Sequence, residues 1–187
     1  MTGPVGKTAV AVAVSDLPDE AWVSHALVDA DWLRWVYPRS SRDPFESALG
    51  IRNLAAVWAN YRAADAERLL LLDIVETRES VAAYLSAVPG AEITVVRLRA
   101  PISTVHRRLE GRETAENLAW YRRRAIALSE LLEDDGVGDV LVDTEGRNVR
   151  EVARSILHSE GGWSPGNHQT TKPSVSERGR KPPVAAP

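Results

Sequence analysis

The stretch RLLLLDIVETRESVAAYLSAVPGAEITVVRLRA, residues 68–100, carries the clearest indication of the fold. It begins with an apolar run (68–75), continues with an amphipathic segment (79–88) and closes with a second apolar run (93–100). Short continuous apolar runs are typical of strands that are buried on both faces, and helical spacing marks the segment between them. This order predicts two parallel strands joined by a helical crossover.

The same alternation continues on both sides of this stretch. We predict further strands at 25–31 and 139–144, and helices at 51–65, 103–113, 116–135 and 148–159. The run AVAVAV (9–14) is apolar at every position, so the sequence leaves open whether it forms a buried helix or a buried strand. The predicted fold class is α/β, with a mainly parallel sheet between two layers of helices.

The composition excludes several classes of protein. The chain of 187 residues has no cysteine, which rules out disulfides and thiolate metal sites. A net charge of -3 does not indicate a nucleic-acid surface, and no apolar run is long enough for a membrane span. We therefore expect a cytoplasmic protein without nucleic-acid or membrane partners, either a monomer or a homodimer.

The composition changes near Ser159. Residues 159–187 are rich in Pro, Gly, Ser and Thr and nearly free of large aliphatic side chains. Such a segment buries too little apolar surface to offset the entropy that it would lose on ordering. We predict one folded domain over residues 1–158 and a disordered tail over 159–187.

The most specific chemical pattern is a short phosphate-binding loop near the start of the chain: Gly3, Pro4, Val5, Gly6, Lys7 and Thr8. Glycines let backbone N–H groups curl around phosphates, a lysine reaches the outer phosphates, and a threonine hydroxyl holds Mg²⁺. Only two residues separate Gly3 from Gly6, whereas the full pattern has four. No room remains before Gly3 for the strand that normally leads into such a loop.

Four segments together resemble the small P-loop kinases of the adenylyl-sulfate-kinase-like and shikimate-kinase-like type, and a group of actinobacterial ATP-binding proteins. The segments are TGPVGKTAV (2–10), ALVDADWLRW (26–35), RNLAAVWANYRAADAERLLLLDIVET (52–77), and TVVRLRAPISTVHRRLEGRE (94–113) with DVLVDTEGRNVREVARSIL (139–157). The resemblance implies a three-layer P-loop NTPase fold whose first strand is missing. It also implies ATP and Mg²⁺ as cofactors.

The resemblance further implies roles for individual residues. It gives catalytic roles to Lys7, Asp29, Asp31 and Arg112, and binding of an anionic acceptor to Arg34 and Arg52. Mg²⁺ would be held by Thr8 and Asp73, and the nucleotide by the loop with Arg107, Thr144 and Arg147. Trp32 and Trp35 would flank the acceptor.

For the acids, the sequence also allows plain structural roles. Asp31 would then cap the next helix, Asp29 would be solvated, and Asp73 would simply end its strand.

Two functions remain open on this basis. The first is a kinase that transfers the γ-phosphoryl group of ATP to a small hydroxylated acceptor, which the sequence does not identify. The second is a nucleotide-binding or interaction protein that keeps the scaffold without turnover, as the shortened loop and missing strand suggest.

Overall fold

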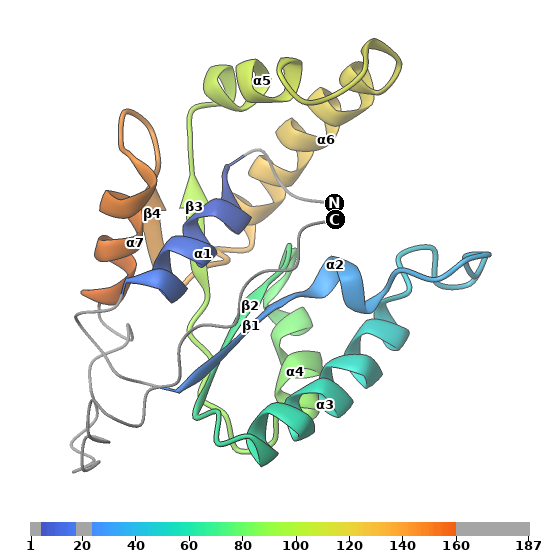
Figure 1. Cartoon of the computed structure of the whole chain (residues 1–187). Helices are drawn as coiled ribbons and strands as arrows, with labels where there is room; N and C mark the ends of the chain where they lie inside the picture. The colour runs from blue at the N-terminus through green and yellow to red at the C-terminus, as the bar shows by residue number, and fades with distance from the viewer. Residues whose placement is uncertain (1–4, 18–23, 160–187) are drawn as a thin grey trace, which may run out of the picture.

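The computed structural model describes residues 5–17 and 24–159. Its elements in chain order are α1 Lys7–Asp16, β1 His25–Asp29, α2 Ala30–Leu33, α3 Ser47–Ala63, β2 Arg68–Leu72, α4 Arg78–Ala87, β3 Val96–Arg99, α5 Ile102–Glu110, α6 Ala115–Asp134, β4 Val140–Asp143 and α7 Val149–Leu157 (Figure 1). The predicted α/β class with parallel strands is confirmed. Gly3, Pro4 and most of the predicted tail lie outside the described residues.

The strands of the described residues form two parallel pairs. β1 pairs with β2 from His25↔Arg68 to Asp29↔Leu72, and β3 pairs with β4 from Val96↔Val140 to Arg99↔Asp143. The physical reason is that no strand of the described residues lies between β2 and β3.

The run AVAVAV is helical, which resolves the alternative that the sequence leaves open. It makes up most of α1, and Val10, Ala11 and Val14 are buried. α1 packs against α7, β1 and β2, so it connects the two strand pairs. A helix satisfies all its interior backbone groups internally, which allows this apolar run to be buried without a neighbouring strand.

Each strand pair has its own apolar cluster. The buried members of the first are Val28, Leu54, Ala87 and Val88, from β1, α3 and the end of α4. Those of the second are Val10, Val14, Val142, Val152, Ala153 and Leu157, from α1, β4 and α7. Helices therefore cover opposite faces of the strands, with α3 and α4 on one side and α1 and α7 on the other (Figure 1).

Over the described ranges, no helix is both long and apolar enough to cross a bilayer.

Candidate phosphate-binding site

The last residues of the predicted phosphate-binding loop form the start of helix α1. Gly6 is the N-cap residue, with φ 87° and ψ 24°, a left-handed conformation that glycine adopts without strain. Its carbonyl oxygen accepts the first helical hydrogen bond from Val10 N–H at 3.0 Å. No described side chain caps this end of the helix, and the first turn carries no acid. The N–H groups of the first turn are thus oriented toward whatever anion approaches the helix N-terminus.

A pocket of 390 Å³ opens at this helix end. Its lining residues come from α1, from the end of β1, from α2 and from the segment after α5: Gly6, Lys7, Thr8, Ala9, Asp29, Trp32 and Arg112. The pocket therefore brings together Lys7, Asp29 and Arg112, which are far apart in the sequence. Its volume is typical of small-ligand sites.

Lys7 is the electrostatic centre of this pocket. Burial lowers the pKa of its ammonium group below the usual 10.5, and the negative charges of Asp73 and Asp29 oppose that shift. Arg112 and Arg34 act in the same direction as burial. A half-buried cation between two acids and two arginines has lost part of its hydration, which makes it a strong partner for an entering phosphate.

Asp29 has both a local role and a position in the pocket. It is the N-cap of α2, and its Oδ1 accepts a hydrogen bond from Asp31 N–H at 3.1 Å. The capping that the sequence allows for Asp31 is therefore made by Asp29. Asp31 lies in the first turn of α2 and does not line the pocket. The structure thus distinguishes between the two acids that the sequence treats as equivalent.

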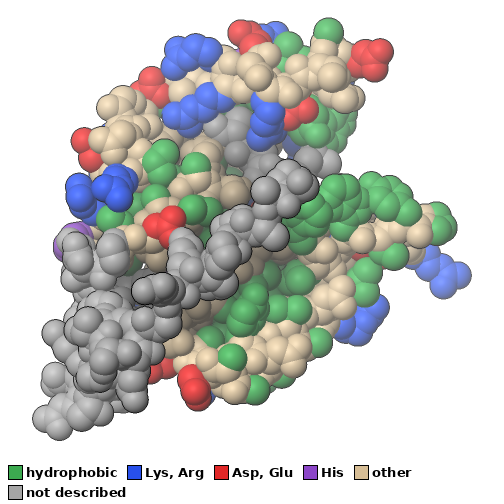
Figure 2. Space-filling view, in the orientation of Figure 1, with side chains coloured by type: hydrophobic (Ala, Val, Ile, Leu, Met, Phe, Trp, Pro, Cys, Tyr) green, Lys and Arg blue, Asp and Glu red, His purple; other side chains and the backbone are tan. Residues whose placement is uncertain are grey.

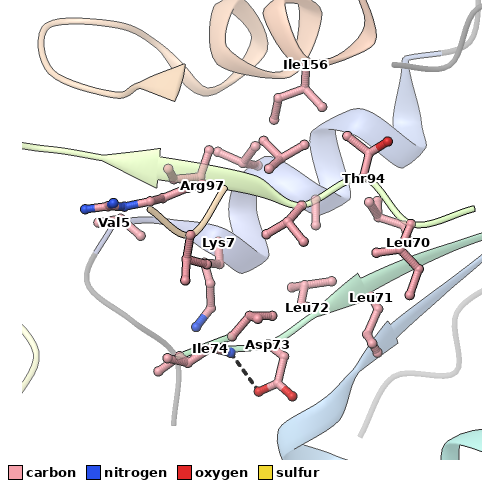
Figure 3. Close-up of a pocket in the computed structure, with 18 of the residues that line it drawn as sticks. Val5, Lys7, Leu70, Leu71, Leu72, Asp73, Ile74, Thr94, Arg97 and Ile156 are labelled. Carbon is pink, nitrogen blue, oxygen red and sulfur yellow. Dashed lines mark hydrogen bonds between the residues drawn. The ribbon is translucent and has the colours of Figure 1, made fainter. Parts of the chain in front are cut away.

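Asp73 follows β2 and is held by its own partners. Its side chain is 4% exposed and accepts hydrogen bonds from Arg34 Nη2 and Tyr84 Oη, while Ile74 N–H donates to Oδ1 at 2.7 Å. Burial and the neighbouring carboxylate raise the pKa of Tyr84, so its hydroxyl stays protonated as a donor. Figure 3 shows Asp73 and Lys7 reaching toward the same space. The charges of Asp73 and Arg34 therefore neutralise each other in this structure.

Tyr84 is not among the predicted site residues, although the sequence offers a weak signal for it. It lies on the apolar face of the predicted helix 79–88, three residues after Val81 and four before Val88. A phenol on such a face needs a buried acceptor, and the acid that ends the neighbouring apolar run is the obvious one.

Four predicted ligands lie away from the Lys7 pocket. Arg52 is exposed on α3, and Arg107 bonds Thr104 Oγ1 at 2.9 Å while its guanidinium lies 3.8 Å from Glu145. Thr144 is buried and donates to the carbonyl oxygen of Arg99 at 3.0 Å, which occupies its hydroxyl hydrogen. Arg147 donates to Asp143 O, Glu151 O and Ser155 Oγ around the start of α7.

An exposed aromatic surface adjoins the pocket at α2 and the segment that follows. Trp32 and Trp35 pack with ring centroids 4.7 Å apart, and they are 68% and 55% exposed. Tyr37 and Phe45 are exposed farther along, and Figure 2 shows hydrophobic side chains gathered over this part of the surface. Large exposed aromatic side chains beside a polar pocket are typical of ligand-binding surfaces.

Comparison with known proteins identifies the fold. No protein-family model matches the sequence, and no curated protein matches it. Among solved structures, a tunicamycin resistance protein from Deinococcus radiodurans is similar, with 22% identity and a TM-score of 0.57 over 82% of this chain and 87% of that one. A gluconokinase from Sinorhizobium meliloti 1021 has 20% identity and a TM-score of 0.49 over 81% and 83%. The chain thus shares a mixed α/β fold with parallel strands with the tunicamycin resistance protein.

Proposed function

We propose that this chain binds Mg-ATP and transfers the γ-phosphoryl group to a small hydroxylated acceptor. The observation that carries the proposal is the position of Lys7 at the N-terminus of α1, in one pocket with Asp29 and Arg112. Phosphoryl transfer depends mainly on positioning and on stabilisation of negative charge, and these groups supply both.

Each pocket group has a distinct part in the proposal. The first-turn N–H groups and Lys7 bind the phosphates, and Arg112 adds positive charge from the segment after α5. The Thr8 hydroxyl and the Asp29 carboxylate are hard oxygen donors in one pocket, which suits Mg²⁺ carried by the nucleotide. That ion would supply charge neutralisation. No cluster of three acidic or histidine side chains able to hold a metal by itself occurs in the described ranges.

The acceptor side would be formed by Asp29 and the aromatic surface. Asp29 can accept the proton of a hydroxyl that enters the pocket beside Trp32. The exposed faces of Trp32 and Trp35 would pack against the carbon skeleton of the acceptor and exclude water from that side.

A second function, nucleotide binding without turnover, is favoured by one observation. Asp73 and Arg34, predicted to bind Mg²⁺ and acceptor, are occupied with each other and with Tyr84. If this arrangement persists with nucleotide bound, Asp29 is the one predicted acid that lines the pocket.

Calorimetric titration with Mg-ATP tests the proposal. We expect Lys7→Ala to weaken binding by about 10- to 100-fold, since it removes a charge-assisted bond to phosphate. The matched control is Arg123→Ala, which removes an exposed cation from α6 and should leave the affinity unchanged.

Equal affinity of wild type and Lys7→Ala would overturn the proposal. Lys7-dependent binding without ADP formation across a panel of sugars, polyols and nucleosides would favour the second function instead.

A further inference from the structure

Helix α6 has an exposed face that carries large apolar side chains. The helix has 20 residues and none of its side chains is buried; it packs mainly against α5 (Figure 1). Trp120 and Ile126 are 46% and 41% exposed. They lie on the same side of the helix as the exposed residues Ala119 and Ala127, because residues three, four and seven apart share one face. We call the face formed by residues 119, 120, 123, 126, 127 and 130 the outer stripe.

The outer stripe also carries two charges of opposite sign, Arg123 and Glu130. Both are exposed, and neither forms an ion pair or a side-chain hydrogen bond with another described residue, whereas Arg122 is paired with Glu110. Arg123 and Glu130 do not pair within one helix, because seven residues separate their Cα atoms by about 10.5 Å along the axis. Each charge is therefore available to a partner.

A second copy of the same helix complements both charges. Two α6 helices can pack antiparallel about a two-fold axis that passes between residues 126 and 127. Arg123 then faces the partner's Glu130, and the two-fold axis repeats this contact, so both charge pairs form at once. At the centre Ile126 meets the partner's Ala127, whose small side chain lets the two helices approach closely.

The same charges disfavour the other arrangements of two such helices. Parallel packing in register places Arg123 against the partner's Arg123 and Glu130 against the partner's Glu130. Sliding the antiparallel pair by seven residues moves the two-fold axis to residue 123 or to residue 130, where two like charges meet. Juxtaposed like charges are destabilising, so the charges of the outer stripe favour the antiparallel register centred between residues 126 and 127.

We propose that this chain forms a homodimer in which the outer stripes of two α6 helices pack antiparallel. Trp120 is prepared for this contact, because Tyr121 packs edge-on against it with ring centroids 4.9 Å apart and restricts the indole before association. A single pair of helices about 30 Å long buries less than the roughly 1,600 Å² of a standard complex. We therefore expect a weak dimer that dissociates in the micromolar range.

This inference does not rest on the proposed kinase activity. No residue of α6 lines the Lys7 pocket. Loss of the dimer should therefore leave the affinity for Mg-ATP unchanged, and loss of nucleotide binding should leave the dimer intact. Calorimetry and sedimentation of the same variants thus distinguish failure of one proposal from failure of the other.

Sedimentation velocity over a concentration series tests the charge pairs. Arg123→Glu and Glu130→Arg should each weaken association by about 10- to 100-fold, because each turns both symmetric contacts from attractive to repulsive. An equal mixture of the two variants should associate as tightly as wild type, since each introduced charge then faces its opposite. Glutamate and arginine both favour helices, so α6 should keep its structure, which circular dichroism checks.

Arg150→Glu is the matched control for net charge. It makes the same change of charge at an exposed residue in the first turn of α7, away from the outer stripe. We expect its association to equal that of wild type.

Single cysteines test the register, because the chain has no cysteine of its own. In the proposed dimer, residue 127 lies beside the two-fold axis, so Ala127→Cys should form a disulfide with the partner under mild oxidation. Ala119→Cys, on the same stripe, should not, because its two copies lie about 22 Å apart along the helices.

Several results would overturn the inference. These are a wild-type chain that stays monomeric at its highest soluble concentration, association of Arg123→Glu equal to that of Arg150→Glu, or a mixture of the two charge variants that associates no better than either alone. Equal crosslinking of the two cysteine variants would indicate parallel helices and would contradict it as well.

Discussion

The β1–β2 pair and the β3–β4 pair are both two-stranded and parallel, yet they place their charged residues differently. At the carboxyl end of the first pair, Asp29 and Asp73 both act on the charge of Lys7. We call β1 and β2 with α2, α3 and α4 the first half, and β3 and β4 with α5, α6 and α7 the second half. In the second half, Arg97 bonds Glu133 of α6 and Arg99 bonds Asp143, so these charges neutralise each other. The second half contributes Arg112 to the Lys7 pocket.

This difference shows where chemistry can occur in the molecule. Charges that are paired with each other, as Asp73 is with Arg34, hold helices and strands together, whereas Lys7, Asp29 and Arg112 line a pocket that a ligand can enter. Lys7 lies on α1, the helix that packs against elements of both halves. Changes that alter the first half should therefore affect the site more than equivalent changes in the second.

The largest expected effect is on the free energy of unfolding, when one partner of an ion pair is removed in each half. Arg34→Ala should lower the free energy of unfolding by about 3 kcal/mol, because it leaves the buried Asp73 carboxylate without its ion-pair partner. Glu133→Gln should cost less than about 1 kcal/mol, because Glu133 is 57% exposed and Arg97 keeps its 2.8 Å bond to Leu132 O. Urea denaturation measures both. Equal losses in the free energy of unfolding would show that the Arg34–Asp73 pair stabilises the fold no more than the Arg97–Glu133 pair.

The next effect concerns the charge of Lys7. Since its pKa lies below the usual 10.5, Mg-ATP affinity should start to fall at a lower pH than for an exposed lysine, by up to about tenfold per pH unit above that pKa. Lys7→Arg, which stays charged, is the control and should show no such fall. Calorimetry across alkaline pH measures both proteins, and identical profiles would contradict the proposed part of Lys7.

The contribution of Lys7 to folding stability should rise with pH, whereas its contribution to Mg-ATP affinity should fall. Between the lowered pKa and 10.5 the unfolded chain holds the Lys7 proton more tightly than the folded chain. The contribution of Lys7 to the free energy of unfolding therefore rises with pH across this window. Chemical denaturation of wild type and Lys7→Arg separates this contribution from those of other groups.

Gly6→Ala should have a smaller effect, about 1 kcal/mol of lost stability, because an alanine is strained at φ 87°. Gly111→Ala is the matched control: its φ is -76°, and an added Cβ would lie at ordinary contact distance, 3.8 Å from Arg108 O. Thermal denaturation compares them. A Gly6→Ala protein as stable as Gly111→Ala would contradict the left-handed conformation at the helix start.

The smallest effects are shifts in the titration of Lys7. Asp29→Asn should lower the pKa of Lys7 further while keeping the cap of α2, since asparagine caps as well as aspartate. Arg112→Gln should raise that pKa by removing a neighbouring positive charge. NMR titration of ¹⁵N-labelled lysine measures the two shifts. Shifts of the same sign would mean that the two halves do not act on Lys7 as described.

The sequence predicts the elements of this fold well because their signals are local. The apolar run 68–75 and the helix pattern 116–135 correspond to β2 and α6, although β2 ends three residues earlier and α6 is displaced by one residue. The division of the sheet could not be read from any one run, because a strand pattern does not specify its neighbour. The run 9–14 does not distinguish helix from strand, because all its residues are apolar and either form would be buried.

The site was predictable in part. Lys7, Thr8, Asp29 and Arg112 meet in one pocket, as expected for residues at a phosphate loop and at the end of a parallel strand. The partners of Asp73 were not predictable, because Arg34 and Tyr84 are 39 and 11 residues away in sequence. Thr144 and Arg147 had plausible positions in the chain, but Thr144 donates to the carbonyl oxygen of Arg99 on the neighbouring part of β3, and Arg147 donates to that of Asp143.

If the start of α1 binds the phosphates of ATP through Lys7, two-dimensional ¹⁵N–¹H NMR during titration with Mg-ATP should show it. We expect the largest shifts at the amides of Gly6, Lys7, Thr8 and Ala9, and we expect Lys7→Ala to abolish them at the same nucleotide concentration. Shifts confined to other parts of the chain, or undiminished in Lys7→Ala, would contradict it.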